Sequence, residues 1–162
     1  MRNWLFFSLI LILGALELTF LGYFRIFNIK PDLFLLCAVL ASLMLEASPA
    51  VVLSLFAGLL KDSCSSNPFG INTVLFFLWS LIIIKLNRKI SLDNNFLRMG
   101  LVFIVALLNN SFSGITLLYL GRGIPLGIFL RTVLIGSLYT ALAVPPVFSI
   151  IKRFIFNNYR LV

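Results

Sequence analysis

The apolar residues of this chain are gathered into long runs, and the longest run constrains the fold most. Residues 33–60 are apolar apart from Glu46, Ser48-Pro49 and scattered small residues. Hydrophobic residues make up 61% of the 162 residues and charged residues only 11%, too few to cover a water-soluble globule. Lipid is therefore the expected solvent for most of the chain, which predicts an all-α polytopic membrane protein.

The apolar runs predict six transmembrane segments within one integral membrane domain, residues 1–162. We expect them at about residues 5–24, 33–45, 49–60, 70–86, 99–120 and 124–151. One helix over residues 33–60 would be about 42 Å long, longer than the bilayer core is thick, and Pro49 would break it. We therefore predict two short, broken helices in a hairpin that bends at Glu46, followed by a polar loop over residues 61–69. Five segments remain the alternative.

The formal charge of +8 fits the positive-inside rule for membrane proteins better than nucleic-acid binding. With six segments and the N-terminus inside, eight of the thirteen Lys and Arg residues fall on the cytoplasmic side. With five segments and the N-terminus outside, nine of the thirteen do, so the rule does not separate the two topologies. Both topologies place the loop over residues 87–98 and the C-terminus in the cytoplasm.

The composition argues against catalysis and against a bound metal or cofactor. The chain has no histidine, which removes Ser-His and Cys-His dyads, histidine zinc sites and histidine haem ligation. An intramembrane enzyme is therefore the least favoured class. Asp62 stands beside Lys61 and is expected to be a helix-end charge. The two cysteines, Cys37 and Cys64, form no CxxC motif.

Three charges fall inside or close to apolar segments: Glu17, Glu46 and Arg131. Ionisable groups at membrane depth are costly and usually face the protein interior or a partner. A Glu17–Arg131 pair is one arrangement, and snorkelling of Arg131 to the interface is another.

Small residues recur at helical spacing, as at Ala50, Ser54 and Gly58. Such a stripe lets two helix backbones approach closely in lipid. The second helix could belong to this bundle or to a partner protein.

Three motifs between residues 30 and 72 resemble one known family. They are Lys30-Pro31-Asp32-Leu33, then Ala57-Gly58-Leu59-Leu60-x-Asp62, then Pro68-Phe69-Gly70-Ile71-Asn72. With Pro125 and the Pro145-Pro146…Lys152-Arg153 ending, they are similar to the rod shape-determining protein MreD family. Lys30 stands where that family more often has Arg, and Lys61 where an apolar residue is common.

The resemblance implies a component of the cell-elongation machinery in the bacterial inner membrane, without known catalytic residues. It implies association with the bitopic protein MreC and, through it, the actin-like MreB. It also implies work with a lateral-wall peptidoglycan glycosyltransferase and transpeptidase. The implied fold is similar to the six-helix substrate-binding subunits of vitamin transporters.

We therefore expect a membrane scaffold that presents the 31–72 region and its small-residue face to a partner helix. The candidate partner-binding residues are Pro31, Asp32, Ala50, Ser54, Gly58, Asp62, Gly70 and Asn72. The basic loop over residues 88–98 and the C-terminal tail are expected to touch anionic lipid or a cytoplasmic filament.

A small-solute transporter subunit is the alternative function. It requires a pocket in which Glu17, Glu46, Asn72 or Arg131 converge on a ligand.

Overall fold

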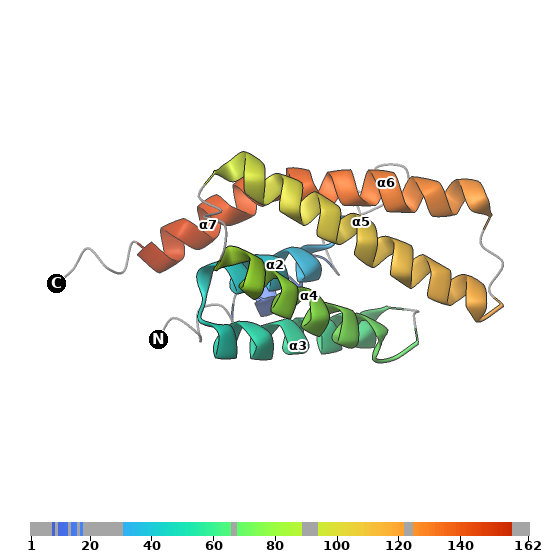
Figure 1. Cartoon of the computed structure of the whole chain (residues 1–162), viewed down its shortest axis with the longest axis horizontal. Helices are drawn as coiled ribbons and strands as arrows, with labels where there is room; N and C mark the ends of the chain where they lie inside the picture. Colours follow the sequence, from blue (N-terminus) through green and yellow to red (C-terminus); the bar gives the residue numbers. More distant parts are fainter. Residues whose placement is uncertain are drawn as a thin grey trace.

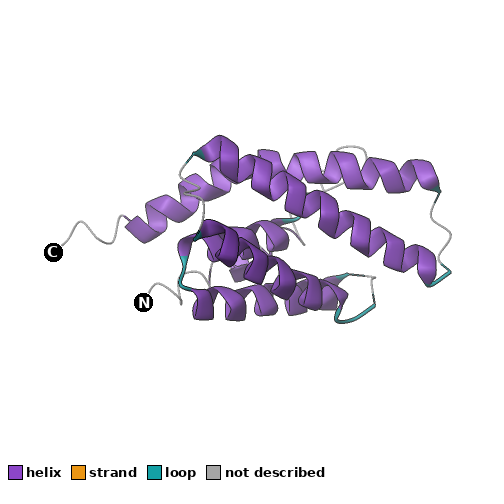
Figure 2. Ribbon diagram, in the orientation of Figure 1, coloured by secondary structure: helices purple, strands orange, loops and turns teal. Residues whose placement is uncertain are grey.

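The computed structural model describes residues 8, 10–12, 14–15, 17, 31–65, 68–88, 94–121 and 125–156. Within these ranges all the regular structure is helical, as Figure 2 shows. Helices α2, α3 and α4 pack together in one layer (Figure 1). Helices α5 and α6 pack together in a second layer, and α7 contacts both of them. Of the predicted segment over residues 5–24, the positions described between 8 and 17 are helical, and the remainder lies outside the described residues.

The predicted hairpin within residues 33–60 is present as α2 (Leu33–Met44) and α3 (Ala47–Cys64). Leu45 ends α2 and Glu46 precedes α3, so the chain bends where the sequence indicated. The boundaries of the second helix were predicted wrongly. Pro49 is the third residue of α3, in the first turn, where a missing N–H costs no helical hydrogen bond. The helix also continues to Cys64, so residues 61–64 are helical and not part of a loop.

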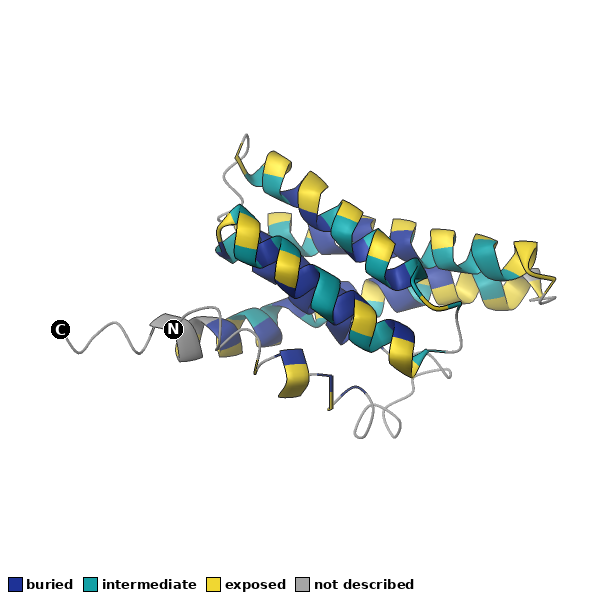
Figure 3. Ribbon diagram, turned by 90° about the horizontal axis from the view of Figure 1, so that it is seen from below, coloured by how far each residue is buried: buried dark blue, intermediate teal, exposed yellow. Residues whose placement is uncertain are grey.

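Helix α2 is the centre of its layer, because every residue from Leu33 to Ser42 is buried. This explains why its sequence is apolar without a polar face. Its 12 residues give a length of about 18 Å, shorter than the bilayer core. A helix that ends at membrane depth is tolerated where protein surrounds it, and Figure 3 shows buried residues along the inner faces of the surrounding helices.

Helix α4 (Ile71–Asn87) runs antiparallel to α3 and parallel to α2. At its end the side-chain amide of Asn87 donates to the Leu43 carbonyl at 3.0 Å. In its middle the hydroxyl of Ser42 donates to Ser80 at 3.0 Å. Phe76, fully buried, fills the space between these helices. The three helices therefore form one packed unit.

The second layer begins with α5 (Asn95–Tyr119), which starts earlier than predicted because Asn94 caps it. The carboxamide of Asn94 accepts the Phe96 N–H at 3.2 Å. The predicted last segment over residues 124–151 is two helices, α6 (Leu126–Leu142) and α7 (Val144–Phe156). The break at Ala143 follows from Pro145 and Pro146, which have no N–H to donate to the preceding turn.

Within the described ranges, three stretches are long and apolar enough to cross a bilayer: Ala47–Cys64, Asn95–Tyr119 and Gly127–Ile151. Large apolar side chains cover the outer faces of these stretches, with Val52 62% and Ile104 59% exposed. Lipid, in contrast to water, carries no penalty for such a surface. The prediction of an all-α membrane helix bundle is confirmed.

Candidate functional site

The start of α2 is held by two carboxylates from different parts of the chain. Asp32 is the N-cap residue, and its Oδ1 accepts the Leu35 N–H at 3.0 Å. Glu17, only 5% exposed, reaches the same turn, where Oε2 accepts the N–H groups of Leu33 at 2.9 Å and Phe34 at 3.2 Å. The first amides of a helix have no partner within it and carry the positive end of the helix dipole. The two carboxylates accept hydrogen bonds from these amides and place negative charge at the positive end of the dipole.

The start of α4 is held by Asp62, which lies in the last turn of α3. One carboxylate oxygen accepts the N–H of Asn72 at 3.1 Å and its side-chain amide at 2.8 Å. The other accepts the N–H of Gly70 at 3.0 Å and, from Thr73, the N–H at 2.9 Å and the hydroxyl at 2.6 Å. Gly70 makes this approach possible because its φ of +100° lies in the left-handed region. Asp62 is therefore an N-cap for α4 supplied by the neighbouring helix.

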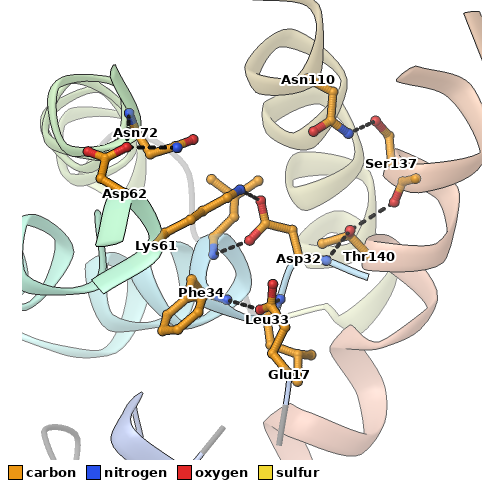
Figure 4. A network of polar contacts seen from close by, with 12 residues as sticks. Glu17, Asp32, Leu33, Phe34, Lys61, Asp62, Asn72, Asn110, Ser137 and Thr140 are labelled. Atoms are coloured by element: carbon orange, nitrogen blue, oxygen red, sulfur yellow. Dashed lines mark hydrogen bonds and ion pairs between the residues drawn. The ribbon is translucent and has the colours of Figure 1, made fainter. Parts of the chain in front are cut away.

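Lys61 connects the two capped helix starts. Its ammonium group forms an ion pair with Oδ2 of Asp32 and lies 5.3 Å from the centre of the Phe76 ring. The adjacent pair Lys61-Asp62 thus ties the end of α3 to the start of α2 through one side chain and to the start of α4 through the other (Figure 4). We call the group Glu17, Asp32, Lys61 and Asp62 the charged clamp.

The charged clamp also reaches the second layer. The N–H of Asp32 donates to the hydroxyl of Thr140 in α6 at 3.0 Å. One turn earlier in α6, Ser137 accepts from the side chain of Asn110 in α5 at 3.3 Å. In Figure 4, Thr140 lies beside Asp32, and Asn110 and Ser137 contact each other where α5 and α6 meet. Neighbouring Asn109 is fully buried, and neither its amide nitrogen nor its oxygen has a hydrogen-bond partner among the described residues.

The small-residue stripe of α3 faces the inside of the bundle. Ala50 and Ser54 are fully buried, and the Ser54 hydroxyl donates to the Ala50 carbonyl of its own helix at 2.9 Å. Gly58 lies against the backbone of α4, where a Cβ atom would stand 2.6 Å from the Cα of Thr73. The close packing that the spacing indicated therefore occurs between α3 and helices of this chain.

Most of the predicted partner-binding residues come together, although not on an outer surface. Pro31, Asp32, Asp62 and Asn72 are buried around the charged clamp, and Gly70 is partly buried beside them. Ala50, Ser54 and Gly58 follow the inner face of α3. Direct contact of these side chains with a partner stays a prediction that the structure does not test.

The four residues expected to line a transporter pocket do not converge. Asn72 is engaged by Asp62, and Glu17 by the start of α2. Glu46 is exposed at the bend between α2 and α3, and Arg131 is exposed on α6. A Glu17–Arg131 ion pair, one of the arrangements that the sequence left open, stays a prediction.

The sequence singles out all four residues of the charged clamp but not the contacts between them. Asp32 was expected to open a helix, because Pro-Asp before an apolar run is a start signal. The contributions of Glu17 and Thr140 had no local signal, since both act across more than fifteen positions of sequence. Lys61 was noted as unusual, and its contact with Asp32 gives the physical reason.

The carboxylates of the clamp hold the starts of α2 and α4. Among the described residues no group of three Cys, Asp or Glu side chains could hold a metal ion. Cys37 is buried and Cys64 is exposed, and both are free thiols.

Comparisons with known proteins place the chain in a family. Neither the curated proteins nor the solved structures give a match. The likeness to transporter substrate-binding subunits therefore stays a prediction. A family model described as rod shape-determining protein MreD matches residues 1–156, nearly the whole chain. With its helices long and apolar enough to span a membrane, the chain belongs to the MreD family of shape-determining membrane proteins.

Proposed function

We propose that this chain is a non-catalytic membrane scaffold of the bacterial cell-elongation complex. In this role it binds an MreC-like bitopic protein and the lateral-wall peptidoglycan synthesis machinery, and so maintains the rod shape. An MreB-like filament would be reached indirectly, through the bitopic partner. The proposed location is the inner membrane, with the C-terminus in the cytoplasm. Membership of the MreD family supports the role in shape determination.

The observation that supports the scaffold proposal is that the buried carboxylates bind the starts of helices. Glu17, Asp32 and Asp62 each accept hydrogen bonds from the first turn of a helix, and Asp32 is also paired with Lys61. A general acid or base needs a carboxyl group within reach of a substrate proton. These three groups instead fix helix positions, as expected of a protein that presents a defined surface to partners.

We place the docking surface for the bitopic partner on the outer face of α3. Helices α2 and α4 occupy the inner face of α3. A helix of a partner protein that docks on α3 therefore has only the outer face of this helix to contact. Val52 and Leu59 lie two turns apart on it and are 62% and 42% exposed. A transmembrane partner segment packs on such a face by van der Waals contact.

Co-purification from native membranes tests the docking surface. We expect the Val52→Trp, Leu59→Trp double variant to recover several-fold less of the MreC-like partner than the parent chain. A matched control is Ile104→Trp, Ile115→Trp on α5, whose residues are 59% and 56% exposed. Gly58 is unsuitable for this test, because a larger residue there would displace α4. Equal recovery from both double variants would remove α3 as the docking face.

Complementation tests the function itself. Cells depleted of the chain should become round, and the parent chain should restore rods. Retained rod shape after depletion, together with no partner in the co-purification, would refute the scaffold role.

A further inference from the structure

The end of the bundle opposite the charged clamp gathers the ends of three helices around one core. Ile83 near the end of α4, Val102 near the start of α5 and Val147 in α7 are buried in the same apolar cluster. The guanidinium group of Arg98 lies 4.1 Å from the centre of the Phe148 ring, which joins the start of α5 to α7. Helix α5 contacts both α4 and α7, so side chains at the end of α4, at the start of α5 and on α7 share this end of the bundle.

That surface is strongly basic. It carries Lys85 and Arg88 at the end of α4, Arg98 in the first turn of α5 and Arg153 in α7. Lys85, Arg88 and Arg153 are exposed. Among the described residues near this end, one side chain is acidic. It is Glu46, which lies at the bend after α2. We call Lys85, Arg88, Arg98 and Arg153 the basic end.

Large apolar side chains stand exposed among these cations. Phe96 is 79% and Leu97 is 50% exposed, both within two positions of Arg98 in the chain, and Ile150, one turn from Arg153, is 45% exposed. Helix α7 is amphipathic, with Val144, Val147 and Ile151 against the core and Ile150 and Arg153 outside.

A surface that mixes exposed cations with exposed apolar groups matches the interface of a lipid bilayer. The lipid interface offers hydrocarbon to apolar side chains and phosphate to cations within a few ångströms. An acidic protein surface would satisfy Lys85 and Arg88 but would leave Phe96 in contact with water or with charged groups.

We propose that the basic end is a binding surface for the head groups of anionic phospholipids. Phosphates would bind Lys85, Arg88 and Arg153, while Phe96, Leu97 and Ile150 enter the adjacent acyl region. This contact would orient α7 at the membrane surface and would fix the depth of the α5 start. It is independent of which protein the scaffold binds.

The test uses the purified full chain in a neutral detergent, titrated with phosphatidylglycerol or phosphatidylethanolamine of identical acyl chains. Native mass spectrometry counts the lipids that stay bound. We expect a several-fold preference for phosphatidylglycerol, which weakens as salt is added. We expect Lys85→Gln, Arg88→Gln and Arg153→Gln together to abolish it. Each single change should weaken binding about fivefold, because one basic residue near an anionic surface contributes about 1 kcal/mol.

Two control variants separate a lipid surface from a general charge effect. The charge-preserving Lys85→Arg, Arg88→Lys, Arg153→Lys variant should keep the preference. Arg131→Gln, at an exposed position on α6, should keep it where Arg88→Gln weakens it. Equal binding of the two lipids by the parent chain would overturn the proposal. So would a preference that survives in the triple Gln variant, or equal losses in Arg88→Gln and Arg131→Gln.

Discussion

At the scale of single residues, Asp62 does the most to join two helices. Its carboxylate accepts five hydrogen bonds from Gly70, Asn72 and Thr73. We expect Asp62→Ala to lower stability by about 3 kcal/mol or more, because hydrogen bonds to a charged group contribute about 1.5–3 kcal/mol each and buried donors lose their acceptor. Asp62→Asn should cost less, since one acceptor oxygen remains. Thermal unfolding in detergent, followed by fluorescence-detected size-exclusion, measures both.

Glu46 supplies the matched control for Asp62. It also precedes a helix, but it is exposed and its side chain makes no capping hydrogen bond to α3. Glu46→Ala should therefore change stability by no more than about 0.5 kcal/mol. Equal losses for Glu46→Ala and Asp62→Ala would contradict the capping role assigned to Asp62.

For Asn109 we expect removal of a polar side chain to raise stability, in contrast to Asp62. Its buried carboxamide lacks a partner among the described residues, and an unsatisfied buried polar group costs about 1–3 kcal/mol. Asn109→Leu replaces it with an apolar side chain of similar size and should raise the unfolding temperature. Asn110→Leu, which removes the contact with Ser137, should not. A loss of stability in Asn109→Leu would refute the assignment of Asn109 as unsatisfied.

At the scale of elements, the contact between α3 and α4 depends on Gly58. A Cβ at this position would stand 2.6 Å from the Cα of Thr73, and backbone cannot move aside as a flexible side chain can. We expect Gly58→Ala to destabilise the bundle by about 1–3 kcal/mol, the usual cost of overpacking. Gly100→Ala, in α5 with open space around it, should stabilise the chain by up to about 1 kcal/mol through helix propensity. The same unfolding assay compares them, and a stable Gly58→Ala variant would contradict the close approach.

The helices themselves were largely predictable, and the wrong end of α3 has a specific physical cause. The length of the apolar run over residues 33–60 and the rarity of proline inside helices together required a break. Lys61 and Asp62 fell within a predicted loop, because polar residues after an apolar run usually mark a loop, although Asp62 was also expected to be a helix-end charge, as it is. Here both remain helical, since Asp32 and the start of α4 provide partners that only the tertiary structure brings near.

At the scale of the whole molecule, the sequence establishes the solvent and the family but leaves the partner face open. Low charge content and long apolar runs require lipid, and the 30–72 motifs are similar to MreD. The stripe Ala50, Ser54 and Gly58 indicates that a backbone packs closely on α3. Spacing alone does not say whose backbone that is. The structure answers with α4, which shifts the search for partners to the opposite side of the same helix.

A polar contact whose strength is measurable joins the two layers of the molecule. The N–H of Asp32 donates to Thr140, and both residues are buried. Thr140→Val keeps the shape of the side chain but removes the acceptor, so a buried N–H would be left unpaired at a cost of about 1–2 kcal/mol. We expect a lower unfolding temperature and faster hydrogen exchange at the start of α2, while Thr140→Ser should retain most of the parent stability.

Thr132 in the same helix provides the control. Its replacement measures how much stability the loss of a threonine hydroxyl costs where the hydroxyl makes no bond between layers. It is exposed, and its hydroxyl donates to the Ile128 carbonyl of its own helix at 2.8 Å. Thr132→Val should therefore leave both measurements nearly unchanged. If Thr140→Val behaved in the same way, the Asp32–Thr140 hydrogen bond would contribute little to holding the layers together. The layers would then be free to shift against each other when a partner binds, because apolar contacts impose less directional preference than a hydrogen bond does.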